Sequence, residues 1–164
     1  MLTLTVERSG LENLRRVSQG LRALADMDFV PFFERVVEPD FERIELEQFA
    51  SQGARGEGGG WAPLSPAYAA AKAKRFPGRP ILEASGRMKG SLTQRGHPDS
   101  FRRLTRDTYE RGTSVPYAGA HATGTSRMPA RPPIGVTEAD FDKWAVALGD
   151  FVGEQLGRIT GGIA

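Results

Sequence analysis

Two histidines are the residues in this 164-residue chain best suited to acid–base or metal chemistry. His97 and His121 stand in segments that the sequence predicts as loops, and neither belongs to an H-E-x-x-H, G-x-S-x-G or paired-carboxylate pattern. His121, close to Tyr117, fits a general base, but a single loop histidine more commonly fixes the backbone through hydrogen bonds. The chain has no cysteine, which excludes thiolate metal sites and thiol nucleophiles. We therefore expect no enzyme, no metal site and no cofactor.

Basic side chains concentrate in the middle of the chain. Residues 61–111 hold eleven lysines and arginines against four acids, whereas residues 1–60 hold seven arginines against eleven acids. Such unlike charges suit docking of one segment on the other, or a basic surface beside nucleic acid. Phe76 and Phe101 are too few to predict a stacking platform for single strands. We expect only passive contact with a DNA backbone, and the side chains expected to face it are Lys72, Lys74, Arg75, Arg102 and Arg103.

Residue types that dominate interface energies also occur in predicted loops. They are Trp61, Tyr68, Tyr117, Arg127 and Arg131. These side chains fit a protein–protein module, and the aromatic rings equally fit the closing of the ends of a small core. Both interpretations stay open from the residues alone.

The N-terminal elements are predicted from periodicity. Residues 2–6 alternate leucine or valine with threonine, as in a strand. Apolar residues at three- or four-residue spacing predict an amphipathic helix over about 10–26. A second helix is expected over 28–49, with a kink or restart at Pro39, because proline lacks the amide hydrogen.

A glycine-rich segment follows, with five glycines between residues 53 and 60. A helix precedes it and the lysine of a P-loop is absent, so we expect a flexible loop and no phosphate cradle. Helices are predicted over 67–74, capped by Ser65, and over 81–93.

The last third mixes strands and a helix. Strands are expected over about 100–106 and 108–114, then an extended proline-rich segment over 127–134 and a helix from Thr137. The whole predicts a single α+β domain over 1–164, with N-terminal helices, a small antiparallel sheet and a C-terminal helix packed on the sheet. Apolar stretches are far shorter than the roughly 18 residues of a membrane span, so we expect synthesis in a cytoplasm and no membrane contact.

Short motifs in a fixed order resemble the phage virion-morphogenesis, or tail-completion, family of tailed bacteriophages. They span about residues 61–135 and are Trp61-x-Pro63-Leu64-Ser65, Tyr68, Lys72, Ile81-Leu82-x-x-Ser85-Gly86-x-Met88-x-x-Ser91, Gly112-Thr113, Tyr117-Ala118-x-x-His121-x-x-Gly124 and Pro129-Ala130-Arg131-Pro132. Two departures stand out. The usual Phe-Leu-Gly after the last motif is Pro133-Ile134-Gly135, and the usual glutamine after the histidine is Ala122.

The resemblance implies a non-enzymatic structural virion protein. Such α+β subunits form a ring, commonly hexameric, as a tail completion or tail terminator protein at the head–tail junction. The implied partners are further copies of the chain, the tail tube protein and the head–tail connector or stopper protein, with passive contact to genomic DNA. The implied place is the tail or neck of the virion, assembled in the bacterial host cytoplasm. The terminator and completion layers both stay open.

The resemblance also implies roles for five residues. Trp61 and Leu64 would anchor the glycine-rich loop onto the sheet or onto a neighbour. Tyr117, His121 and Arg131 would build the turn that joins the last strands, with Arg131 donating to backbone carbonyls or to a neighbouring carboxylate. The alternative function is a non-specific nucleic-acid-binding protein that uses the basic segment 72–111.

Overall fold

The computed structural model describes residues 8–55 and 59–159, and it has the predicted α+β class. The strand expected over residues 2–6 lies outside the described residues. In chain order the elements are α1 (Arg8–Ala25), α2 (Val30–Phe32), the π-helical segment η1 (Phe33–Val37), α3 (Glu38–Ala50), α4 (Pro66–Arg75), α5 (Arg87–Thr93), β1 (Ser100–Leu104), β2 (Tyr109–Thr113), α6 (Ala118–Thr123) and α7 (Glu138–Ile159).

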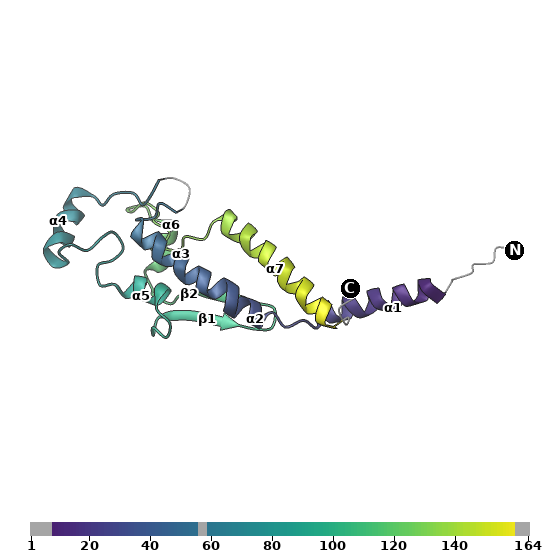
Figure 1. The fold of residues 1–164 in the computed structure, drawn as a ribbon. Helices are drawn as coiled ribbons and strands as arrows, with labels where there is room; N and C mark the ends of the chain where they lie inside the picture. Colours follow the sequence, from purple (N-terminus) through teal and green to yellow (C-terminus); the bar gives the residue numbers. More distant parts are fainter. Residues whose placement is uncertain (1–7, 56–58, 160–164) are drawn as a thin grey trace.

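A continuous helical rod of α2, η1 and α3 runs through the middle of the molecule (Figure 1). The Asp28 carboxylate accepts the amide of Val30 at 3.0 Å just before the rod begins. At the position where a kink or restart was predicted, the rod changes its helix type without a break: the π-helical turns of η1 give way to the α-helical turns of α3 at Glu38. Pro39 is the second residue of α3.

The best-buried apolar cluster lies where α3 meets α5 and the chain around residue 61. Its members are Phe49, Trp61, Met88, Leu92, Val115 and Ala118. Ser65 caps α4 as predicted, its hydroxyl accepting the amide of Tyr68 at 3.4 Å. The helix expected over 81–93 is correct only from Arg87 onward. Leu82 and Gly86 both have positive φ angles, which end any helical path before α5.

The small sheet is the expected hairpin of β1 and β2. The strands are antiparallel, with Arg102 opposite Arg111, and the amide of Thr105 donates to the carbonyl of Thr108 at 2.9 Å across the turn. The Asp107 carboxylate accepts the hydroxyls of both threonines at 3.0 Å, which fixes the turn.

The C-terminal helix α7 opens as predicted but packs differently. The amide and hydroxyl of Thr137 donate to Asp140 at 2.8 and 2.7 Å. The helix packs mainly against α1 and η1, whereas the hairpin packs mainly against α5. Aromatic contacts explain the difference, because the Phe151 ring lies 5.8 Å from that of Phe32 and 6.2 Å from that of Phe29. The expectation that α7 lies directly on the sheet is therefore wrong.

Candidate functional site

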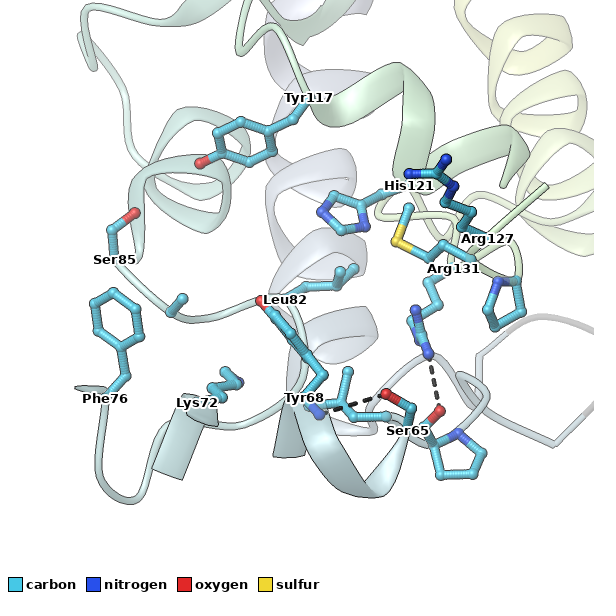
Figure 2. Close-up of a pocket in the computed structure, with 15 residues that line it drawn as sticks. Ser65, Tyr68, Lys72, Phe76, Leu82, Ser85, Tyr117, His121, Arg127 and Arg131 are labelled. Carbon is cyan, nitrogen blue, oxygen red and sulfur yellow. Dashed lines mark hydrogen bonds between the residues drawn. The ribbon is translucent and has the colours of Figure 1, made fainter. Parts of the chain in front are cut away.

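An open cavity of about 820 Å³ lies between α4, the segment before α5, the start of α6 and the chain leading to Arg131 (Figure 2). Most of its walls are apolar. The lining residues are Pro63, Leu64, Ser65, Tyr68, Lys72, Phe76, Leu82, Ala84, Ser85, Tyr117, His121, Arg127, Met128, Pro129 and Arg131. The motifs that are scattered through the sequence therefore meet around one space.

Arg131 holds one wall of this cavity to another. Its side chain is only 3% exposed, and its Nε and Nη2 donate to the carbonyls of Ala62 and Pro63 at 2.7 and 2.9 Å. Its own amide donates to the carbonyl of His121 at 2.6 Å. Of the two alternatives left open by the sequence, the side chain takes the backbone carbonyls. One arginine thus ties three separate chain segments together.

Tyr117 and His121 face each other at the start of α6, beside the segment that carries Arg131 (Figure 2). Their ring centroids are 5.9 Å apart and the ring planes are nearly perpendicular. Burial, together with the charge of Arg131, lowers the pKa of His121 and so favours its neutral form. His121 belongs to α6, and Tyr117 directly precedes this helix. The expectation that the two residues build a turn between strands is therefore wrong. The reason is that the hairpin is already closed before Tyr117.

Trp61 anchors the glycine-rich segment, but to α3 instead of the sheet. Its ring meets that of Phe49 edge-on at 5.4 Å, and its Nε1 donates to the carbonyl of Pro132 at 2.9 Å. Gly53 makes this possible, because a Cβ there would lie 2.4 Å from the indole, and its φ of 87° also suits glycine. Leu64, by contrast, is half-buried and lines the cavity.

The start of the loop expected to be flexible over 53–60 is held in place. Arg55 donates to the carbonyl of Gly135 at 2.7 Å and to both oxygens of Asp140 at 3.1 and 3.2 Å. Although burial opposes the effect, the hydrogen bonds from Arg55 and Thr137 lower the pKa of Asp140 to about 2. Residues 56–58 lie outside the described part of the chain, so flexibility stays a prediction for them.

The five basic residues expected to face DNA fall into two groups. Lys72 is buried and donates to the carbonyls of Arg79 and Pro80, and burial lowers its pKa. Arg102 donates to Glu38 at 2.8 Å, which holds the pKa of that carboxyl below its usual range. Both side chains thus bind groups of their own subunit. This argues against a DNA-facing role for both, and most strongly for Lys72, which is buried.

The second group stays available at the surface. Lys74 and Arg75 are exposed on α4, with the Arg75 guanidinium 5.3 Å from the centroid of the Phe76 ring. Arg103 is exposed on β1, 3.6 Å from Glu110. Passive DNA contact remains a prediction for these three side chains.

The two histidines do not form one site. His97 lines a different, polar cavity, where its Nδ1 accepts the amide of Asp99 at 3.1 Å. Within residues 8–55 and 59–159, no group of three histidine, aspartate or glutamate side chains is placed to hold a metal ion. No helix in that part of the chain is both long and apolar enough to cross a membrane.

Some structurally important residues are not found by reading the sequence. Arg55 is surrounded by glycines and small residues, so nothing local signals its partners on α7. Glu45 is fully buried, and it lies at helical spacing with the apolar residues Phe41, Ile44 and Phe49, a signal that could have placed it in the interior. Its Oε1 accepts the amide of Gly135 at 3.2 Å, while its Oε2 has no partner among the described residues.

Chemically, the cavity suits an apolar occupant. Its size and lining match sites that take an apolar ligand or the inserted side chains of a protein partner, with a few polar groups to fix orientation. Tyr68 and Tyr117 are exposed at its edge, as at the anchoring points of protein interfaces.

Comparison with known families agrees with the motifs. The sequence profile of the phage virion morphogenesis family matches residues 11–149, which include every wall of the cavity. The chain therefore belongs to this family and has a role in phage virion morphogenesis, as the motifs predicted. No curated protein and no solved structure matches the chain.

Proposed function

We propose that this chain is a structural subunit that completes the tail of a tailed phage. Copies of the chain form a ring, with six-fold symmetry, at the head–tail junction. The ring lies in the neck of the virion between the tail tube protein and the connector or stopper protein, and it is assembled in the host cytoplasm. The subunit acts by binding neighbours and catalyses no reaction.

One observation carries this proposal: the motif residues of a virion morphogenesis protein surround an open, mainly apolar cavity. Buried side chains of the motifs, Arg131 and Lys72, hold the walls through backbone carbonyls. Exposed ones, Tyr68 and Tyr117, stand at the edge. A structural subunit needs such a preformed receptor, because ordering the site before binding reduces the entropic cost of assembly. We infer that a segment of a neighbouring virion protein inserts here.

Non-specific nucleic-acid binding is the second candidate. Lys74, Arg75 and Arg103 are exposed and favour weak contact with passing DNA. Lys72 is buried and Arg102 is paired with Glu38. The basic segment 72–111 therefore presents fewer positive charges to a nucleic acid than its sequence suggests. Salt-sensitive DNA retention by the purified chain would favour this candidate.

Electron microscopy of particles made without the chain tests the proposal. Deleting the gene from the phage should leave separate heads and tails, and supplying the wild-type chain from a plasmid should restore joined particles. Ala84→Trp, which fills the cavity, should lower the yield of joined particles about tenfold or more, because one blocked anchor removes much of the binding energy. Ala71→Trp, on the exposed side of α4, is the matched control. Normal joined particles in the absence of the chain would contradict the proposed function.

A further inference from the structure

The helix α1 projects beyond its contact with α7 (Figure 1), and it carries an uncovered apolar stripe. Val17 is 60% exposed, Leu21 is 63% exposed and Leu24 is also exposed. Their spacing of four and three residues places them on one face of the helix. A stripe of this kind on a projecting helix is costly in water and is typical of a helix that packs against another surface.

The base of α1 is fixed in a direction that leaves this stripe open. Met27 is buried just after the helix, and the amide of Phe29 donates to the carbonyl of Arg106 at 2.8 Å. The Arg106 side chain donates in turn to the carbonyl of Ala25 at 3.2 Å. The turn of the hairpin therefore holds the end of α1, which opposes folding of the helix back onto its own subunit.

A second apolar surface is left open between η1, β2 and α7. It is a groove of about 470 Å³, whose walls include Phe33, Tyr109, Ile134, Phe141, Trp144 and Leu148. The rings of Phe33 and Tyr109 stack at 5.9 Å and form its floor on the hairpin side. Phe141, which is 55% exposed, and Ile134 stand open at its edge.

The charges of the two surfaces are opposite. α1 contains four arginines and one glutamate, whereas α7 contains five acidic residues and two basic ones. On α7, Glu138, Asp142 and Asp150 are exposed. A basic helix with an apolar stripe is thus complementary to an apolar groove that α7 borders with acidic side chains.

We infer that α1 of one copy of this chain docks, with Val17, Leu21 and Leu24, in the groove of the next copy. This inference rests on the proposed function, since it names the contact by which the subunits assemble. The helix and the groove are different surfaces, so the contact is head-to-tail. Such contacts close into a ring when the rotation between successive copies allows it.

Paired variants of the purified full chain test the contact. Leu21→Glu disables the helix and keeps the groove, whereas Phe141→Glu disables the groove and keeps the helix. Each variant alone should be monomeric by native mass spectrometry and sedimentation, because a charge placed in an apolar contact weakens it by roughly 100-fold or more. Mixed together, the two should form a complex of two chains, since one intact helix still meets one intact groove.

Two controls separate the contact from general damage. Gln19→Glu adds a charge to α1 away from the stripe, and Val146→Glu adds one to an exposed position of α7 that does not line the groove. Both should assemble like the wild type. All four positions are exposed, so circular dichroism and the unfolding midpoint should stay at wild-type values.

The inference is overturned if the wild-type chain is monomeric, if Leu21→Glu or Phe141→Glu assembles normally, or if the mixture stays monomeric. Binding of α1 to the groove of its own chain would produce the first of these results, a monomeric wild type. The proposed function is tested separately by the joined particles described above. Rings that persist in both variants would therefore reject this contact and leave the tail-completion role standing.

Discussion

Replacing Arg131 with alanine should lower the free energy of unfolding by about 2 to 4 kcal/mol, because two charge-assisted hydrogen bonds to buried carbonyls are lost together. The guanidinium ties Ala62 and Pro63 to the segment after α6, and both contacts are shorter than 3.0 Å. Without them the cavity wall formed by residues 62–64 is released. We therefore expect loss of joined particles together with loss of stability.

The matched control for Arg131 is Arg127→Ala. Arg127 lines the same cavity but is exposed, and the structure gives its guanidinium no hydrogen bond within residues 8–55 and 59–159. Its removal should change stability by less than about 0.5 kcal/mol. Arg131→Lys should recover only part of the loss, because a single ammonium cannot reproduce the planar fork. Urea unfolding of the three variants measures these differences, and equal stability of Arg131→Ala and the wild type would contradict the role of the arginine.

Replacing Glu45 with glutamine should change how stability depends on pH. Burial raises the pKa of Glu45 to about 7, against which the hydrogen bond from Gly135 and the charges of Arg55 and Arg111 act only partly. The folded state therefore holds a proton that the unfolded chain releases near pH 4.5. The stability from this proton is fully present below pH 4.5, and it is lost as the pH rises through about 7.

The expected result is a difference between variant and wild type that grows with pH. Between pH 5 and pH 8 the unfolding free energy of Glu45→Gln should gain about 2 to 3 kcal/mol relative to the wild type. Glu47→Gln on the exposed side of α3 is the control, because contact with Arg43 lowers the pKa of Glu47 instead of raising it. Urea unfolding at several pH values provides the measurement. A difference that is independent of pH would show that Glu45 stays ionised in the folded chain.

Local sequence signals predicted the elements whose stabilising contacts are also local. The hairpin turn depends on Asp107 and its two threonines, and α7 opens on the pair Thr137 and Asp140. The cap of α4 and the turn at Asp28 before the rod follow the same logic, because in each a side chain accepts from an amide two or three residues away. Hence the order and approximate bounds of most helices and strands could be predicted.

Long-range contacts account for the errors. The segment 81–86 has the residue spacing of a helix, but contacts with distant residues set its path. The amide of Ile81 donates to the side chain of Gln52, and Lys72 donates to the two carbonyls just before Ile81. The position of α7 was misjudged because Phe151 packs on the rings of Phe29 and Phe32, contacts that no local pattern predicts. For the site, family resemblance identified Arg131 and His121 as important, but only the folded chain shows them side by side in the lining of one cavity.

Cryo-electron microscopy of intact joined particles tests the central claim most directly. We predict a closed ring of this chain, six copies in all, between the connector and the last layer of the tail tube. Density from a neighbouring protein should fill the cavity beside Tyr68, Tyr117 and Arg131. A head–tail junction fully accounted for by other proteins, with this chain absent from the purified particles, would contradict the account.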